Sequence, residues 1–204
     1  MVTPQGREIR SFALSPRDAL ERLRSGYWMM LREGSFRRDL ERTLKPVIAR
    51  RLNTQRLILV TDGMAPDDVA ADGHMDFVVR RAIELGSSPM QAIQAATLNP
   101  ATYSGLEQEV GGVAPGRYAD IAFLENLDDV RVDSTMIGGR VVAKQGKSLV
   151  SPRPITWPEE TLRCLRLSAN VSPASFHIPC SSPRARIRVM ELLSQNITTE
   201  TIMD

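Results

Sequence analysis

An aspartate that follows a short apolar run is the first residue whose position could support chemistry. Leu57–Val60 is a run of consecutive apolar side chains, the pattern of a strand that is buried on both faces. The run ends at Thr61–Gly63, so Asp62 lies at the carboxyl end of that strand, where α/β barrels place their reacting groups. The alternative is that Asp62 only stabilises the following turn, a common use of aspartate.

Two further polar clusters stand at the ends of predicted elements. The apolar run Tyr27–Leu31 is interpreted as a strand and is followed by the charged cluster Arg32–Ser35. The segment Gly73–Asp76 opens a helix and contributes His74 and Asp76. A polar cluster at the end of a strand is a candidate site for the same reason as Asp62. For His74 and Asp76, the alternative is that they only occupy the first turn of the helix.

The elements around these residues alternate between helix and strand. Ser15 and Pro16 are typical of a helix start, and Gly26 of its end. Helical spacing from Phe36 to Ile48 predicts a second helix, in which Pro46 should cause a kink or a restart. Further helices are predicted over Phe77–Leu85, from Ser88 to Asn99 and from Pro100 to near Gly105, with a polar loop over Pro66–Asp72. The order helix, strand, helix, strand, helix implies parallel strands with right-handed crossovers.

The pattern changes to short strands and turns after the last of these helices. Gly138 and Gly139 have the form of a two-residue hairpin turn. The strands predicted here are Ala119–Leu124, Val130–Val132, Ser134–Ile137, Arg140–Ala143 and Ser148–Val150. They predict a small antiparallel sheet. Beyond Ser151 a proline-rich linker is predicted, followed by a helical segment at Thr161–Leu167 and candidate strands at Phe176–Ile178 and Arg186–Glu191.

The composition is that of an ordinary globular protein. Of its 204 residues, 42% are hydrophobic and 25% charged, which suffices for a buried core. A net charge of +2 is too small to indicate nucleic-acid binding, and no apolar run approaches the ~18 residues of a membrane span. The two cysteines, Cys164 and Cys180, have neither metal-ligand spacing nor a disulfide framework, so a reducing cytoplasm is expected.

Several motifs in the first three quarters of the chain match a known family. Three marks are general: ATLNPA at Ala96–Ala101, GVAPGRYADI at Gly112–Ile121 and the GGRVV hairpin at Gly138–Val142. Three are more specific: LREGS at Leu31–Ser35, TDG at Thr61–Gly63 and GHMD at Gly73–Asp76. With these marks in this order, the stretch Ser15–Ser151 resembles the adenine deaminases of the amidohydrolase superfamily. The general marks alone would fit another cyclic-amide amidohydrolase equally well, and this alternative stays open.

The resemblance implies an α/β fold built on a (β/α)₈ TIM barrel. This chain would supply only the last strands and helices of the barrel, with Tyr27–Leu31 as the seventh strand and Leu57–Val60 as the eighth. Residues 1–106 would form the carboxyl-terminal portion of the barrel, and residues 107–151 strands of a β-sandwich. Residues 152–204 would form a linker and the start of a truncated C-terminal domain.

The resemblance also implies an activity and a set of site residues. The expected reaction is the hydrolysis of adenine to hypoxanthine and ammonia in cytoplasmic purine salvage, with adenine and water as the small-molecule partners. Asp62 would ligate a divalent metal, Mn or Fe with Zn as a further option, and handle the proton of the attacking water. Glu33 would be the second catalytic residue, and Ser35, His74 and Asp76 would bind the substrate or support the metal. Arg32 has a simpler alternative, an ion pair with an acid in a loop.

One departure from the family pattern limits what the chain is expected to do alone. Superfamily metal sites use a His-x-His pair and two later histidines, whereas this chain has two histidines in all, His74 and His177. A catalytic metal needs several convergent ligands. We therefore expect a fragment of a deaminase that is inactive in isolation and acts with a partner supplying the missing barrel half, or as a homo-oligomer. The alternative is a non-catalytic remnant or interaction module.

Overall fold

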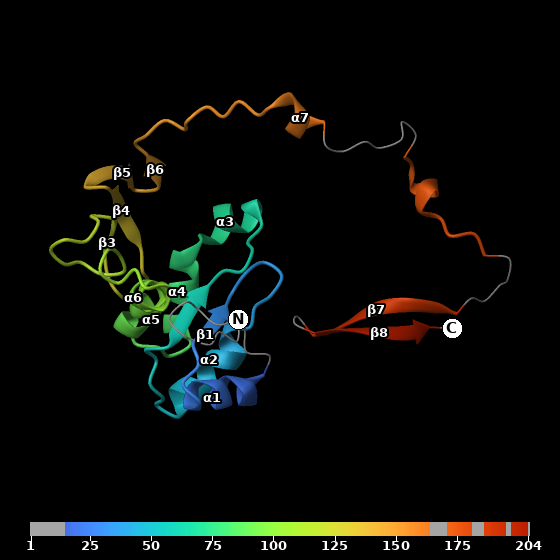
Figure 1. The fold of residues 1–204 in the computed structure, drawn as a ribbon, viewed down its shortest axis with the longest axis horizontal. Helices are drawn as coiled ribbons and strands as arrows, with labels where there is room; N and C mark the ends of the chain where they lie inside the picture. The colour runs from blue at the N-terminus through green and yellow to red at the C-terminus, as the bar shows by residue number, and fades with distance from the viewer. Residues whose placement is uncertain (1–14, 164–170, 181–185, 195–196, 204) are drawn as a thin grey trace. The chain divides into compact units, whose positions relative to one another are not determined.

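The computed structural model describes residues 15–163, 171–180, 186–194 and 197–203 (Figure 1). Contacts along the chain divide it into two units, with the division between Val150 and Ser151. None of the helices in the described residues has both the length and the apolar character that a membrane crossing requires. The first unit carries both segments that the sequence marks for chemistry.

The first unit begins with two helices and two strands in alternation. These elements are α1 (Pro16–Arg24), β1 (Met29–Arg32), α2 (Leu40–Ala49) and β2 (Leu57–Val60). The strands pair in parallel, with Met29 opposite Leu57 and Arg32 opposite Val60. The predicted parallel arrangement is therefore confirmed for this pair. The start of α1 is also as predicted, because the Ser15 side chain accepts a hydrogen bond from the Asp18 N–H at 3.1 Å.

Helix α2 differs from its prediction at its beginning, and of the kink or restart expected at its proline, the restart is absent. Phe36, expected within the helix, is 81% exposed and precedes it. The chain there is tied to the loop after β2, since the Ser35 N–H donates to the Gly63 carbonyl at 3.2 Å, and these bonds compete with a helix. Pro46 lies inside α2, and the helix continues as a single element to Ala49. The packing of the buried Leu44 and Val47 in this helix outweighs the backbone bond that a proline cannot make.

The segment predicted as a polar loop after β2 is a helix, α3 (Pro66–Asp72). Proline is favourable at the first helical position. The negative charges of Asp67 and Asp68 in the first turn interact favourably with the positive N-terminal end of the helix dipole. Three more helices follow, as the sequence predicts: α4 (Met75–Glu84), α5 (Pro89–Ala96) and α6 (Leu98–Ser104). Gly105 ends α6 with a φ of +73°, a left-handed conformation that suits glycine.

The core of the first unit lies around β1 and β2. Leu57, Ile58 and Leu59 are at most 3% exposed, so β2 is buried on both faces, as its continuous apolar run predicts. Met29 and Leu31 of β1 are equally buried. The helices cover them with the buried side chains Ala19, Leu40, Leu44, Val47, Val78, Val79, Ala82, Ala92 and Ala95. This core fixes the positions from which the loops after β1 and β2 emerge.

A four-stranded antiparallel sheet completes the first unit. Its strands are β3 (Ile121–Leu124), β4 (Val132–Ile137), β5 (Arg140–Lys144) and β6 (Lys147–Ser148), in that spatial order. Gly138 and Gly139 form the turn between β4 and β5 with φ values of +55° and +78°, which confirms the predicted hairpin. The strand predicted at Ser134–Ile137 is β4, which also includes Val132 and Asp133, whereas Val130 and Arg131 of the other predicted strand lie before it.

The second unit contains a few short elements after the linker. They are α7 (Glu159–Leu162), a 3₁₀ turn over Pro173–Phe176, β7 (Ile187–Ser194) and β8 (Ile197–Met203). The strand predicted at Phe176–Ile178 is wrong, because Ser172 caps a 3₁₀ turn there. The strand predicted at Arg186–Glu191 is present as β7, paired antiparallel with β8. Most of the helical segment predicted at Thr161–Leu167 lies outside the described residues, which stop at position 163 in this region.

Candidate functional site

The loops that follow β1 and β2 are joined by backbone and side-chain hydrogen bonds. The Glu33 N–H extends the strand pairing by donating to the Val60 carbonyl at 3.0 Å. The Ser35 Oγ accepts a hydrogen bond from the Ala65 N–H at 2.7 Å. Gly34 packs so tightly that a Cβ there would lie 2.3 Å from the Thr61 carbonyl oxygen. The segments that carry Glu33, Ser35 and Asp62 therefore form one structural unit, as their places at the ends of parallel strands predict.

Arg32 is the centre of an ion-pair network at this end of the sheet. Its Nε donates to Asp39 Oδ2 and its Nη1 to Asp62 Oδ2, each at 2.8 Å. The side chains of Arg32 and Asp39 are 6% exposed, whereas that of Asp62 is 37% exposed. The interpretation of Arg32 as the partner of a loop acid is confirmed. The network places a solvent-accessible carboxylate two residues beyond β2.

Asp62 adopts a backbone conformation that few residue types tolerate. Its φ is +50°, in the left-handed region, where aspartate is enriched among non-glycine residues. Gly63 follows with a φ of +87°. The turn at the end of β2 is therefore specified by the local residue types. The turn and Arg32 together determine where the Asp62 carboxylate lies.

Glu33 is buried and is engaged with the start of α2. Its side chain accepts a hydrogen bond from the Leu40 N–H at 3.2 Å, and the residue is 5% exposed. Burial, the largest cause, raises the pKa of the Glu33 carboxyl above its usual value, and the hydrogen bond from Leu40 opposes that shift. Glu33 thus accepts a hydrogen bond from the first backbone N–H of α2, a group that has no partner within the helix itself.

His74 and Asp76 make their contacts at the start of α4. The His74 N–H donates to Asp76 Oδ1 at 2.8 Å, and Asp76 Oδ2 lies 3.5 Å from Arg80. The His74 side chain is exposed. A Cβ at Gly73 would lie 2.5 Å from the Asp76 carboxylate, and the φ of +100° at this position favours glycine. The contacts of these two residues are those of a helix start, and they join Asp76 to α4 and not to the loops around Asp62.

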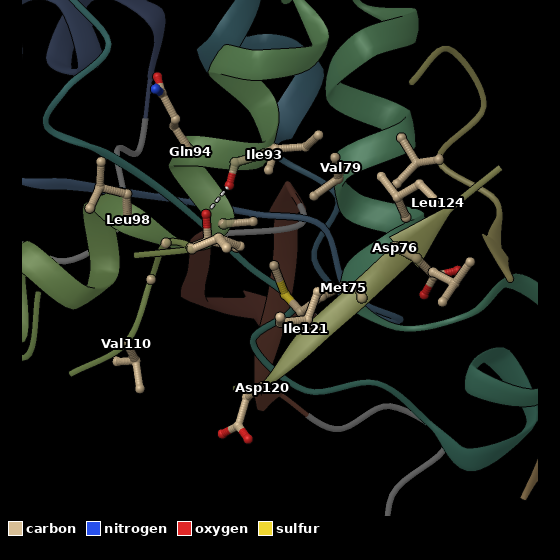
Figure 2. Close-up of a pocket in the computed structure, with 18 of the residues that line it drawn as sticks. Met75, Asp76, Val79, Ile93, Gln94, Leu98, Val110, Asp120, Ile121 and Leu124 are labelled. Atoms are coloured by element: carbon tan, nitrogen blue, oxygen red, sulfur yellow. Dashed lines mark hydrogen bonds between the residues drawn. The ribbon is translucent and has the colours of Figure 1, made fainter. Parts of the chain in front are cut away.

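A cavity of about 550 Å³ lies in the first unit beside Asp76. Its lining is mostly apolar and comes from α4, α5, the segment after α6 and the antiparallel sheet. Figure 2 shows Met75, Ile93, Ile121 and Leu124 among the side chains that line it. Asp76 and Asp120 are the carboxylates of the lining. The cavity is separate from the network around Arg32, whose members do not line it.

The described residues do not fit the divalent metal that the sequence resemblance implies. Within residues 15–163 and the shorter described segments after them, no three His, Cys, Asp or Glu side chains are grouped so as to hold a metal ion. Asp39 and Asp62 converge on a guanidinium, which is itself a cation. Asp62 is a single possible ligand, and one carboxylate does not make a transition-metal site.

Asp39 is the residue of this site that the sequence interpretation missed. It lies at the N-terminal boundary of α2 and seven positions after its partner Arg32, a spacing that no local motif links. The signal that could have found it is an aspartate directly before an apolar helical run, which is typical of a helix N-cap. Here its side chain bonds Arg32 and makes no cap bond to the helix.

Comparisons with known proteins place the chain in a family. The model of the amidohydrolase family matches residues 32–142, which is more than half of the chain. An adenine deaminase of Moorella thermoacetica is 42% identical over 184 residues, or 89% of this chain and 31% of that protein. An adenine deaminase of Rubrobacter xylanophilus is 41% identical over 91% of this chain and 31% of that protein.

A solved structure of molinate hydrolase is also similar. It covers 76% of this chain and 39% of the molinate hydrolase chain, with a TM-score of 0.47 and 17% identity. The present chain spans about 31% of the length of the curated relatives it matches. From the match over residues 32–142, which includes both strand ends and the antiparallel hairpin, the chain belongs to the amidohydrolase family.

Proposed function

We propose that this chain is the carboxyl-terminal barrel portion of an adenine deaminase, which converts adenine and water to hypoxanthine and ammonia. The family implies a fold related to the TIM barrel. Within that fold we assign β1 as the seventh strand and β2 as the eighth. The observation that carries the proposal is the identity of 42% to the Moorella deaminase across 89% of this chain. The parallel pairing of β1 with β2, and an accessible aspartate just beyond β2, support it.

In this proposal Asp62 handles the proton of the attacking water. Its side chain is 37% exposed, and its Oδ2 is held by Arg32, which leaves Oδ1 as the atom we assign to the water. The carboxylate accepts a proton as the water oxygen bonds to C6 of adenine. It then returns that proton to the departing amino group, which leaves as ammonia. A carboxylate fixed by a buried arginine suits this role, because it does not have to be oriented during the reaction.

The structure suggests different roles for the other predicted site residues. Glu33 and Ser35 bond to backbone N–H groups, so we propose that they shape the loops around Asp62 and do not react with substrate. His74 is exposed. We propose that His74 and Asp76 bind the substrate. The implied Mn, Fe or Zn would require ligands from a polypeptide that supplies the rest of the barrel. Cytoplasmic purine salvage is the setting we propose.

A second candidate function is a non-catalytic interaction module built on the same scaffold. The observation that favours it is that the described residues group no three potential metal ligands. In that case the network around Arg32 would be purely structural. The two candidates differ in one measurable property, which is whether activity appears when the remainder of a related barrel is supplied.

Co-expression with a complementary fragment tests the proposal. The fragment is the part of the Moorella thermoacetica deaminase outside its matched region, and the assay is ammonia release from adenine with Mn(II) present. We expect no activity from the 204-residue chain alone and activity from the co-purified pair. In the pair, Asp62→Asn should lower the rate by ~10²–10⁴, since asparagine keeps the shape but cannot accept a proton.

The matched control is Asp67→Asn, the same chemical change at an exposed position of α3. It should leave both assembly and ammonia release unchanged. Robust turnover by Asp62→Asn would remove Asp62 from the mechanism. A pair that assembles and remains inactive, with metal bound by elemental analysis, would favour the non-catalytic module.

A further inference from the structure

We propose that Asp39 is a positioning residue that acts through Arg32 to hold the Asp62 carboxylate at the end of β2. The inference rests on the proposed function for its effect on rate, and on geometry for the linkage itself. Arg32 uses two different nitrogens, Nε for Asp39 and Nη1 for Asp62, each at 2.8 Å. Because the guanidinium is planar and rigid, fixing Nε also fixes the direction in which Nη1 donates.

The burial of the three side chains indicates which part of the linkage is fixed. Arg32 and Asp39 are 6% exposed and Asp62 is 37% exposed, so the Arg32–Asp39 pair lies in the protein and Asp62 reaches solvent. Water competes little for hydrogen bonds to the buried pair, and it competes with Arg32 for Asp62. The exposed carboxylate thus takes its orientation from the buried pair.

Asp39 is itself anchored by α2 and by β1. Its backbone N–H donates to the Arg32 carbonyl at 3.2 Å, and its own carbonyl accepts from Thr43 Oγ1 at 2.7 Å. Thr43 is 1% exposed, within the first turns of α2. Arg32 is the last residue of β1. The linkage therefore runs from a helix start and a strand end, elements that hold side chains more precisely than loops do, to the Asp62 carboxylate.

Asp39 supplies charge as well as position. Arg32 carries one positive charge between two carboxylates, so Asp39 limits how strongly the guanidinium attracts Asp62. Replacing Asp39 by asparagine keeps the size of the side chain and an acceptor oxygen while removing the charge. The guanidinium would then be drawn towards Asp62, the charged partner that the variant keeps in this network. The Asp62 carboxylate would be displaced from the orientation in which it accepts a proton.

A double-mutant cycle on the 204-residue chain tests the linkage without any need for activity. The variants are Asp39→Asn, Asp62→Asn and the double variant, and the measured quantity is the urea midpoint of unfolding. We expect the shift of the double variant to differ from the sum of the single shifts, because both residues act through Arg32. The control cycle pairs Asp39→Asn with Asp67→Asn and should be additive. Additive shifts in both cycles would overturn the linkage.

Kinetics of the co-expressed pair test the effect on the reaction. Asp39→Asn should lower kcat by about 10- to 100-fold and leave KM for adenine unchanged, as expected for a residue that orients a reacting group. An unchanged kcat, or a raised KM alone, would overturn the positioning role. Should Asp39→Asn fail to fold, Asp39→Glu replaces it in both measurements, since glutamate keeps the charge but cannot hold its carboxylate at the same position beside Arg32 Nε.

The two measurements separate this inference from the proposed function. Non-additive coupling in the isolated chain supports the linkage even when the wild-type pair releases no ammonia, and in that event only the proposed function fails. Coupling that is absent while the wild-type pair is active removes Asp39 and leaves the deaminase proposal in place.

Discussion

Glu33 lies where the sequence places a reactive carboxylate, yet its contacts are those of a structural residue. Its side chain accepts the Leu40 N–H at the start of α2, and only 5% of the residue is exposed. Asp62, at the equivalent end of the neighbouring strand, remains accessible. Two carboxylates at adjacent strand ends thus have different environments, and the accessible one is the better candidate for contact with water.

Replacing Glu33 by glutamine should make the protein less sensitive to pH. Burial raises the folded-state pKa of Glu33 above its usual value of 4.5. The folded state therefore holds the proton more tightly than the unfolded state, so the contribution to stability is complete below 4.5 and is lost as pH rises through the folded pKa. Glu33→Gln keeps the acceptor for Leu40 and has no proton to lose. Its urea midpoint should rise relative to wild type from about pH 4 to about pH 7.

The control for this experiment is Glu109→Gln, which removes one negative charge from an exposed residue. It corrects for the general effect of a changed net charge on the unfolding midpoint. A midpoint difference between Glu33→Gln and wild type that is flat, or falls with rising pH, would contradict a raised pKa at Glu33.

At the scale of elements, the loops after β1 and β2 are held together by a close backbone approach at Gly34. A Cβ on Gly34 would lie 2.3 Å from the Thr61 carbonyl oxygen and 2.6 Å from that of Gly63. These atoms belong to the backbone and cannot rotate away. Any side chain at this position must therefore separate the loop that carries Ser35 from the loop that carries Asp62.

Gly34→Ala should therefore destabilise the first unit more than Gly63→Ala does. The first change forces overpacking against two carbonyls, which typically costs about 1–3 kcal/mol. At Gly63 the space is open, and alanine meets only the strain of a φ of +87°, about 1–2 kcal/mol. Urea unfolding of both variants measures the difference. Equal stability of the two, or a less stable Gly63→Ala, would show that the loops are free to separate without cost.

The sequence predicts the elements of the first unit well wherever local signals and packing agree. The apolar run of β2, the Ser15 cap and the Gly138–Gly139 turn each specify their own structure, and all were found. Prediction failed where distant contacts compete with a local pattern. Phe36 has helical spacing, but its neighbour Ser35 is bonded to the loop after β2. At Pro66–Asp72 the opposite error arose, since polar residues suggested a loop although proline and the acids favour a helix start.

The candidate site shows the same limit. Asp62 and Arg32 could be selected because each stands at the end of an apolar run. Their mutual bond depends on the pairing register of β1 and β2, in which Arg32 lies opposite Val60. Asp39 joins the site only because α2 begins beside the end of β1, which no local pattern specifies. The motif alone selects His74 and Asp76 as candidate site residues, and in the structure their contacts lie at the start of α4.

At the scale of the whole molecule, the parallel pair β1–β2 is small for an independent sheet. In the described part of the chain these two strands pair only with each other. A two-stranded sheet is marginal in water, and its outer edges can pair with other strands. The curated relatives are about three times as long as the segment they share with this chain, which covers 31% of the Moorella protein. Within the described residues neither strand has a second strand partner, so further strands can pair at their outer edges, where Asn99 Nδ2 already donates to the Leu57 carbonyl of β2 at 2.8 Å.

The isolated chain should consequently self-associate. Besides the open strand edges, the first unit exposes large apolar side chains, including Phe36, Ile137 and Leu149 at 81%, 57% and 60%. The net charge of +2 gives little repulsion between copies. Light scattering across a dilution series should show a mass above that of one 22.6 kDa chain, rising with concentration.

Salt and the complementary fragment identify the surface responsible. Association through strand edges and apolar side chains should persist at about 1 M salt, where surface ion pairs are screened. The complementary barrel fragment should prevent self-association, because it binds the same strand edges in place of a second copy of the chain. A compact monomer at every concentration, or association that disappears in salt, would contradict this account. A monomer would mean that the strand edges are already covered within the chain. Association that disappears in salt would mean that charged surface groups, and not strand edges, hold the copies together.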